Sequence, residues 1–470
     1  MNRNTLENAL DEISGKYIAE AAKLRRSRLR WAGPLAAVLA IVILVSVFTG
    51  SLTSTGTTSG LSHGRIAAPV YPVMAAYPSL DGDGYKAWQQ SQKEQYSQPK
   101  GYAAGTENFF RSSIQSFLAD CETDNTVCSP VNVYMALAML AETAGGKTRQ
   151  QILDLLGSGS IEALRTQAGY VWNAHYCDDK ATTSKLGNSL WLADWIHYKE
   201  DTVETLAKNY YASVYHGKLG DPKMQRTIRD WLNAQTDGLL SEQVGQLDYP
   251  DMLDMLLAST VYYRVKWANG FNEDRSTQDI FHAPQGDATV TYMHRTIIGG
   301  TFYWGEDFTA VRLALKDDGH MWLILPNEGL TPAELLTSGH AAELALRGSA
   351  KEREAAIINL SLPKFDIAAD KDITPGLKSM GITDAFTLSA ADFTSISYNP
   401  IYVDRVQHAA RVTIDEDGIV AASYTIVGLP EAVEPELPDK EIDFTLDRPF
   451  LFFITSRDNL PLFAGVVNNP

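Results

Sequence analysis

One uncharged run near the C-terminus constrains the fold of this chain more than any other feature. Residues 418–430 (GIVAASYTIVGLP) follow a short acidic turn, Asp415-Glu416-Asp417, and lead into a Pro/Glu-rich stretch with the composition of an exposed loop. A long strand-competent segment that ends in an exposed loop is an aggregation hazard, because its unpaired backbone can pair with other chains. Because the chain retains such a segment, we expect residues 418–430 to form a strand within their own molecule.

The remaining patterns predict helices in the first half and strands in the second. Apolar residues recur at helical spacing from Phe109 to Leu118, and again from Val133 to Ala141 after a Ser-Pro start that suits a helix N-terminus. Short β-branched and aromatic runs predict strands at residues 258–263, 322–325, 357–362, 448–454 and 461–467. This segregation favours an α+β fold over alternating α/β.

Several motifs in fixed order carry a resemblance to a known family. Residues 416–425 (EDGIVAASYT) look like the hinge of a serpin reactive-centre loop, and residues 447–452 and 461–470 resemble that family's C-terminal strands. Upstream, NTVCSP at 125–130, WLNAQTDG at 231–238, KW at 266–267 and MGITDAF at 380–386 are similar to further serpin signatures. The resemblance covers residues 105–470, which we expect to form a serpin domain.

The resemblance implies a fold and a mechanism. The fold would be α+β, with large antiparallel sheets surrounded by helices and an exposed reactive-centre loop. An inhibitory serpin is not an enzyme and needs no cofactor. A serine protease attacks the loop and forms a covalent acyl-enzyme, and the cut loop then inserts into the main sheet and traps the protease irreversibly. The alternative is a non-inhibitory serpin that acts as a binding or chaperone-like module.

The hinge carries most of the physical demand, because inserting side chains alternate between core and solvent. The family register turns Ile419, Ala421, Ser423, Thr425 and Val427 inward, and all five are uncharged. The full hinge implied by the resemblance is Glu416, Gly418, Ile419, Val420, Ala421, Ala422, Ser423, Tyr424 and Thr425. Family spacing places the reactive bond at Ala432-Val433, with Val433-Glu434 as the next choice, and the small Ala432 implies an elastase-like target.

Four further positions follow from the resemblance. Ser129, Ser259 and His408 match the buried polar cluster through which the sheet opens, known as the shutter. The family has an asparagine where Ser259 stands, and a hydroxyl makes fewer hydrogen bonds than an amide. Trp267 matches the tryptophan of the breach, where the hinge enters the sheet. Simple core filling is the competing interpretation for both His408 and Trp267.

Composition excludes several other classes of protein. The net charge of −17 disfavours a nucleic-acid partner and is typical of an acidic surface that keeps a monomer soluble. No Cys-x-x-Cys or His-x-x-x-His spacing predicts a metal site. The three cysteines do not form a disulfide framework, although Cys121 and Cys128 could pair.

The N-terminus predicts a membrane anchor. Residues 31–48 carry no charge and follow a basic cluster that includes Lys23 and Arg30. We expect a cytoplasmic segment at 1–30, a transmembrane signal-anchor helix at 31–49 and a flexible tether at 50–104. This topology would place the protein in the cell membrane as a single-pass protein with its N-terminus inside and residues 105–470 extracytoplasmic. A cleaved signal peptide is the competing interpretation, disfavoured by the long charged region and the lack of an Ala-x-Ala site.

One motif in the tether resembles a catalytic site. Residues 60–64 (GLSHG) match the Gly-x-Ser-x-Gly pattern of a nucleophile elbow around Ser62 and His63. That motif requires a strand before the serine and a helix after it. The tether is not expected to have either, so a hydrolase is the least favoured function.

Overall fold

The computed structural model describes residues 63–75, 82–119, 121–179, 182–245, 253–419 and 438–470. Helices dominate the first half of this part of the chain and strands the second half, which confirms the predicted α+β class. The described α-helices are α3 (Gly82–Tyr96), α4 (Glu107–Phe117), α5 (Pro130–Thr143), α6 (Gly146–Leu155), α7 (Ile161–His175), α8 (Glu200–Asn209), α9 (Pro222–Gln235), α10 (Ser241–Gly245), α11 (Pro332–Ser338), α12 (His340–Arg347) and α13 (Thr374–Ser379).

Local sequence explains where several helices begin. Ser129 caps α5, its hydroxyl accepting a hydrogen bond from the Asn132 amide, and Pro130 occupies the first turn, where its missing N–H costs nothing. Asp221 and Pro222 start α9 in the same way. At α11 the side chain of Thr331 and that of Glu334 satisfy each other's backbone amides in a capping box.

Two sheets are formed by the described strands, one of eight and one of nine. We call the eight-stranded one the first sheet. Its order is β1 (Arg65–Ala67), β5 (Ala212–Gly217), β4 (Thr183–Ala193), β6 (Met255–Lys266), β14 (Gly418–Ile419), β13 (Gln407–Ile414) and β12 (Phe365–Asp372), and β3 (Cys177–Asp178) pairs with β4. All its pairs are antiparallel except β4 with β5.

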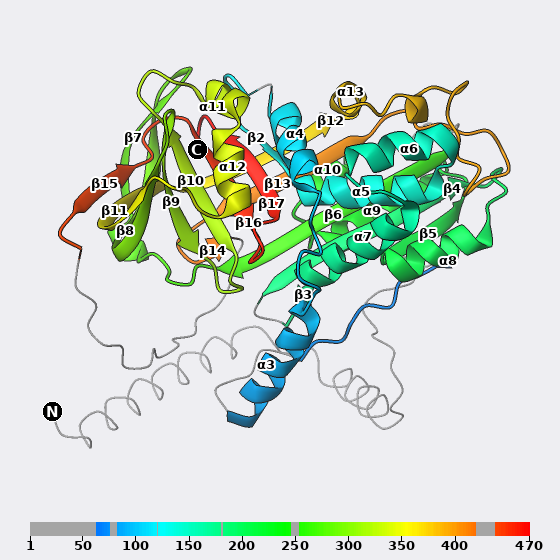
Figure 1. The fold of residues 1–470 in the computed structure, drawn as a ribbon, viewed down its shortest axis with the longest axis horizontal. Helices are drawn as coiled ribbons and strands as arrows, with labels where there is room; N and C mark the ends of the chain where they lie inside the picture. The colour runs from blue at the N-terminus through cyan, green and yellow to red at the C-terminus, as the bar shows by residue number, and fades with distance from the viewer. Residues whose placement is uncertain (1–62, 76–81, 120, 180–181, 246–252, 420–437) are drawn as a thin grey trace, which may run out of the picture. The chain divides into compact units, whose positions relative to one another are not determined.

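The second sheet lies beside the first in Figure 1 and holds the C-terminal strands. Its order is β15 (Glu441–Thr445), β11 (Arg353–Pro363), β8 (Gly286–Trp304), β9 (Phe308–Ala314), β10 (His320–Pro326), β16 (Phe450–Thr455), β17 (Pro461–Val467) and β2 (Thr126–Cys128), and β7 (Thr277–Ala283) pairs with β8. Every residue of β16 and β17 is buried, which confirms the two C-terminal strands predicted from the sequence.

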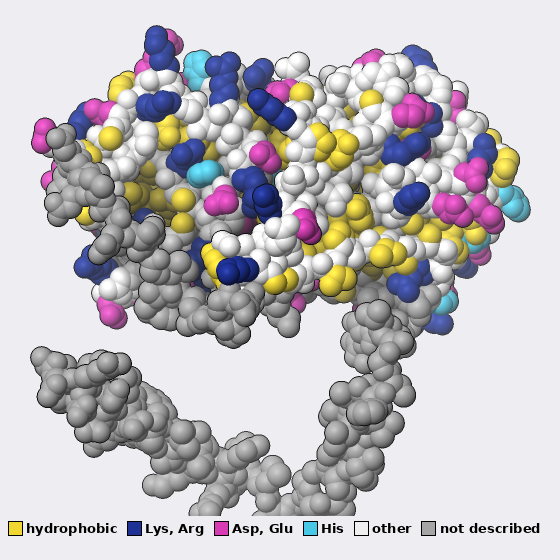
Figure 2. Space-filling view, turned by 60° about the horizontal axis from the view of Figure 1, so that its bottom comes forward, with side chains coloured by type: hydrophobic (Ala, Val, Ile, Leu, Met, Phe, Trp, Pro, Cys, Tyr) yellow, Lys and Arg dark blue, Asp and Glu magenta, His cyan; other side chains and the backbone are white. Residues whose placement is uncertain are grey.

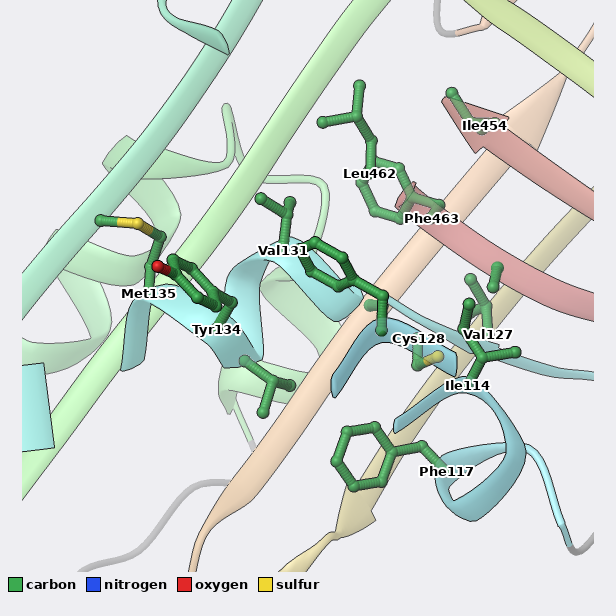
Figure 3. Close-up of a cluster of buried hydrophobic side chains, with 14 of the residues drawn as sticks. Ile114, Phe117, Val127, Cys128, Val131, Tyr134, Met135, Ile454, Leu462 and Phe463 are labelled. Carbon is green, nitrogen blue, oxygen red and sulfur yellow. The ribbon is translucent and has the colours of Figure 1, made fainter. Parts of the chain in front are cut away.

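A continuous apolar core joins the helices to both sheets. Figure 3 shows one part of it, where side chains of α4, β2, α5 and β17 meet, among them Ile114, Cys128, Val131 and Phe463. Cys121, Cys128 and Cys177 are all buried and none of them is in a disulfide, so the possible pairing of Cys121 with Cys128 is not formed. On the face drawn in Figure 2, basic and acidic side chains are interspersed rather than separated.

The segment before α4 differs from the flexible tether expected at 50–104. Residues 65–67 form β1 at the edge of the first sheet, and residues 82–96 form the helix α3. The helix sequence has little apolar periodicity, but it contains four Gln and two Lys, which favour helix. Its contacts with the rest of the chain supply the stability that a short isolated helix lacks.

Candidate functional site

The acidic turn reverses the chain between β13 and β14. The carboxylate of Asp415 accepts hydrogen bonds from the amides of Asp417 (2.9 Å) and Gly418 (3.1 Å), and its own amide donates to the carbonyl of Gly418 (3.1 Å). A short aspartate side chain that binds backbone amides two and three residues later stabilises such a turn. The run 418–430 therefore starts by folding back against β13.

Glu416 ties this turn to two other elements. Its carboxylate lies 2.6 Å from Lys364 Nζ and accepts a hydrogen bond of 2.6 Å from Ser276 Oγ. Burial alone would raise the pKa of Glu416, but the hydrogen bonds from Lys364 and Ser276 outweigh burial and lower that pKa. The carboxylate therefore stays charged at neutral pH and fixes the start of the predicted hinge.

Trp267 holds the same turn from the end of β6. Its indole N–H donates to the Asp415 carbonyl (2.9 Å) and its backbone amide donates to the Asp417 carbonyl (3.2 Å). The ring is buried and packs edge-to-face on Phe271. The predicted breach tryptophan thus lies at the point where the hinge meets the sheet.

Gly418 and Ile419 form β14 and lie between β6 and β13. Gly418 pairs with Lys266, and Ile419 pairs with Val265 on one side and Ile414 on the other. A Cβ at Gly418 would lie 2.4 Å from the Val265 carbonyl oxygen, so only glycine fits there. The side chain of Ile419 is buried, with 2% of its surface exposed.

Beyond these two residues, the strands that the structure describes leave the first sheet open between β6 and β13. Among the described strands β6 has no direct ladder with β13, since β14 is the neighbour of both. A cavity of about 320 Å³ lies there. Its lining includes Ser259 and Thr260 of β6, Gln407 and Ala409 of β13, and apolar side chains of α5, α9 and α10. The charged residues Asp370, Asp404 and Arg405 also line it. We call this space between β6 and β13 the slot.

Two of the predicted shutter residues meet beside the slot. The amide of Ser129 donates to His408 Nε2 (3.0 Å), so this ring nitrogen is unprotonated. Burial lowers the pKa of His408 to about 4, because a charged imidazole is costly away from water. The hydrogen bond needs the neutral ring, and both groups are buried.

Ser259 has a different partner, which the sequence did not reveal. Its hydroxyl donates to Asn188 Oδ1 (2.8 Å) on the neighbouring strand β4, and Asn188 Nδ2 donates to the Tyr210 carbonyl (2.7 Å). Asn188 is fully buried. The amide expected at 259 is therefore supplied by the adjacent strand. The available signal was an uncharged amide inside the mostly apolar run LGNSLWL.

The rest of the predicted site lies outside the described residues. This applies to Val420, Ala421, Ala422, Ser423, Tyr424 and Thr425 of the hinge, and to Ala432 and Val433 of the reactive bond. Ser62 of the Gly-x-Ser-x-Gly motif lies outside them too, and the strand β1, not a helix, follows Gly64. The nucleophile-elbow geometry is therefore not formed there.

The predicted membrane localisation needs correction. In the part of the chain that the structure describes, no helix has the length and apolar composition to cross a membrane. A spanning helix needs about 20 apolar residues, and the described helices reach 15. On this finding the predicted single-pass localisation is wrong, and the predicted anchoring to a membrane is not supported. The segment 31–49 itself lies outside the described residues.

Comparisons with known proteins agree with this geometry. The family model described as serpin (serine protease inhibitor) matches residues 105–470. An uncharacterised serpin-like protein of Thermococcus kodakarensis is 27% identical over 78% of this chain and 87% of its own length. Alpha-1-antiproteinase S of Cavia porcellus is 28% identical over 77% and 89%. Corticosteroid-binding globulin of Oryctolagus cuniculus is 26% identical over 76% and 92%.

Solved structures show the same fold. The native state of the thermophilic serpin tengpin superposes with a TM-score of 0.68 at 23% identity, covering 84% of this chain and 98% of tengpin. A thyroxine-binding globulin complex with thyroxine gives a TM-score of 0.65 at 21% identity, covering 78% and 98%. With the family model covering most of the sequence, the chain belongs to the serpin family.

Proposed function

We propose that this protein is an irreversible suicide-substrate inhibitor of serine proteases with elastase-like specificity. The protease cleaves the loop, and the freed segment after β14 fills the slot as a new central strand of the first sheet. The single observation that supports this most is the position of β14, which already lies between β6 and β13 at the entrance of the slot.

The slot offers what an inserting strand needs. The facing edges of β6 and β13 carry backbone groups that a new strand would pair with on both sides. The cavity of about 320 Å³ would receive inward side chains and remove apolar surface from water. Both gains are absent until insertion, so the free energy is stored in the uncut protein.

The hinge register follows from Ile419. Its buried side chain fits the inward set predicted from the sequence, and alternation then turns Ala421, Ser423 and Thr425 inward and Val420 outward. These side chains are small or uncharged, so burying them costs little. The reactive bond at Ala432-Val433 remains the proposed cleavage point, and the small side chain before it suits an elastase-like protease.

The test is incubation of the full chain with pancreatic elastase. The proposal expects an SDS-resistant complex, with mass spectrometry of the released peptide locating the cut after Ala432. Ile419→Arg should convert the inhibitor into a substrate, since a buried unpaired guanidinium would displace β14 from the entrance of the slot before insertion can start. The matched control Val420→Arg puts the same charge on the outward face and should still trap the protease.

Equal trapping by Ile419→Arg and the parent would contradict the hinge register. Ala432→Arg should shift preference toward trypsin-like proteases, because the residue before the scissile bond sets specificity. Unchanged specificity would place the cut elsewhere.

A second candidate is a non-inhibitory serpin that acts as a binding module. The relatives whose printed names are binding globulins favour it. In that case elastase cleaves the loop without forming a stable complex. Loop cleavage with full recovery of elastase activity would support this candidate and exclude the first.

A further inference from the structure

The segment ahead of residue 105 packs on the serpin domain although it lies outside the match to the family model. At one end β1 extends the first sheet, with Arg65 opposite Tyr215 and Ala67 opposite Val214. The ring of Tyr71 then stacks on Trp172 of α7, with centroids 5.6 Å apart, and lies against Tyr176 and Tyr211. The segment is therefore anchored to the edge of the first sheet.

The helix α3 is held at the turn between β3 and β4. The indole N–H of Trp88 donates to Asp179 Oδ2 (2.8 Å), and Gln92 Nε2 donates to the same oxygen (3.1 Å). Gln92 Nε2 also lies 3.9 Å from Cys177 Sγ. Hydrogen bonds to a carboxylate are stronger than those between neutral groups, so this contact fixes α3 on the first sheet.

The C-terminal end of α3 reaches the second sheet. Arg457, in the turn between β16 and β17, stacks over the ring of Tyr96 with its guanidinium carbon 3.7 Å from the ring centroid. Arg457 also donates to the Asp317 carbonyl (3.0 Å) in the turn between β9 and β10. One helix thus touches both sheets.

A second link between the sheets lies beside this contact. Tyr263 of β6 donates its hydroxyl proton to Asp317 Oδ2 (2.6 Å), and Asp317 Oδ1 accepts from the Gly319 amide (3.0 Å). Tyr263 is buried, and it stands four residues before Trp267 at the breach. Burial raises the pKa of Asp317, and its hydrogen bonds oppose this.

We propose that α3 and the Tyr263–Asp317 pair form a clamp that joins β4 and β6 to the second sheet at the end where the hinge enters, and so slows opening of the slot. The clamp is formed within one molecule, since the segment 65–96 of the chain docks on the sheets of the same chain. This inference rests on the proposed function, since the clamp acts on the step that insertion requires.

The geometry gives the direction of the effect. Widening the slot separates β6 from β13, and β4 moves with β6 because the two share a continuous antiparallel ladder from Thr183 to Leu192. Asp179 and Tyr263 would move with them, whereas Arg457 and Asp317 belong to turns of the second sheet. Opening of the slot must therefore stretch or break the contact of α3 with Asp179 on the first sheet or its contact with Arg457 on the second sheet.

A cysteine at position 92 tests the clamp by tightening it. Gln92→Cys places a new thiol on the side of α3 that meets the native Cys177, and oxidation of the full chain is expected to join the two thiols in a disulfide. The oxidised variant should form the elastase complex at least tenfold more slowly than the same variant after reduction. Equal rates for the two forms, with the disulfide verified by mass spectrometry, would overturn the proposal.

A loosening variant tests the opposite direction. Trp88→Phe keeps an aromatic ring but removes the N–H that binds Asp179, and it should speed loss of inhibitory activity on standing about tenfold, equivalent to about 1.4 kcal/mol. Gln90→Ala, whose side chain bonds to Glu94 on the same helix, is the matched control and should leave this rate unchanged. If Trp88 only stabilised the fold, Trp88→Phe would lower the melting temperature of intact and cleaved protein equally. The rate at which inhibitory activity is lost would then not change.

Hydrogen exchange separates failure of the clamp from failure of the proposed function. Trp88→Phe should raise exchange of the amides at residues 183–186 and 261–265, and oxidised Gln92→Cys should lower it, whether or not the protein inhibits a protease. Altered exchange without any elastase complex would support the clamp and contradict the inhibitor. Unaltered exchange in both variants would overturn the clamp alone.

Discussion

In the second sheet β16 pairs with β10 on one side and β17 on the other, and all residues of β16 are buried. In the first sheet, among the described residues, β6 and β13 are bridged only by the two residues of β14. The C-terminal strands have already made their hydrogen bonds and apolar contacts. The strands around the slot leave a cavity of about 320 Å³. The contrast indicates that the second sheet supplies stability and the first sheet holds the free energy that insertion would release.

The largest loss of stability should come from a substitution in the second sheet. Phe450 is fully buried in β16 and packs edge-to-face on Phe281 and Phe365. Phe450→Ala should lower the free energy of unfolding by about 3–5 kcal/mol, because it leaves a cavity in a packed core. Urea unfolding measures this loss. The control Ile298→Ala, at a side chain that is 65% exposed, should change stability by less than about 0.5 kcal/mol.

A pH effect should follow at the shutter. His408 has a folded-state pKa of about 4, below the ordinary value of 6.5. Its contribution to stability is therefore complete above pH 6.5 and is lost as pH falls toward 4, by at most about 3 kcal/mol. Unfolding measured between pH 7 and 4 should show a shallower loss for His408→Gln, which keeps an acceptor for the Ser129 amide.

The pH effect has a matched control in the second sheet. Burial also lowers the pKa of His320, on β10, to about 4. His320→Asn should reduce the pH-dependent loss of stability without changing the rate of protease trapping. A trapping rate that falls equally with pH in His408→Gln and the parent would contradict the assignment of His408 to slot opening.

A glycine substitution tests the entrance of the slot. Gly418→Ala should force β14 away from β6, since the added methyl would lie 2.4 Å from the Val265 carbonyl oxygen. We expect a cost of about 1–3 kcal/mol and more substrate turnover for each trapped protease. Gly159→Ala, where nothing lies within 4 Å of the added methyl, should behave as the parent.

The smallest effect should come from the ion pair at the hinge. Glu416→Gln removes the charge that Lys364 and Ser276 bind, and Lys364 is 35% exposed. A coupling energy of about 1 kcal/mol or less is expected in a double-mutant cycle with Lys364→Met. A coupling of zero would mean that the pair of Lys364 with Glu416 does not help to hold the acidic turn.

The sequence predicted the strands of the second sheet better than the slot in the first sheet. The runs at 448–454 and 461–467 are apolar, short and bounded by turn residues, so local pattern alone identifies β16 and β17. The helices α4 and α5 were equally visible from their apolar spacing. The slot depends on which strands are neighbours, and that information is not local.

The partner of Ser259 and the role of residues 65–96 were missed for the same reason. Asn188 meets Ser259 only because β4 and β6 pair in one register. The helix α3 has no apolar stripe from which it could be predicted. Its contacts through Trp88 and Tyr96 are with residues far along the chain. Single polar and aromatic side chains carry these contacts, and periodicity does not detect them.

The most direct measurement of the central claim is the melting temperature of the protein before and after its loop is cut. Cleaved protein should melt at a higher temperature than intact protein, because the released segment fills the slot and completes the first sheet. Identical melting temperatures, with cleavage verified by mass spectrometry, would mean that no free energy is stored there and would contradict the account.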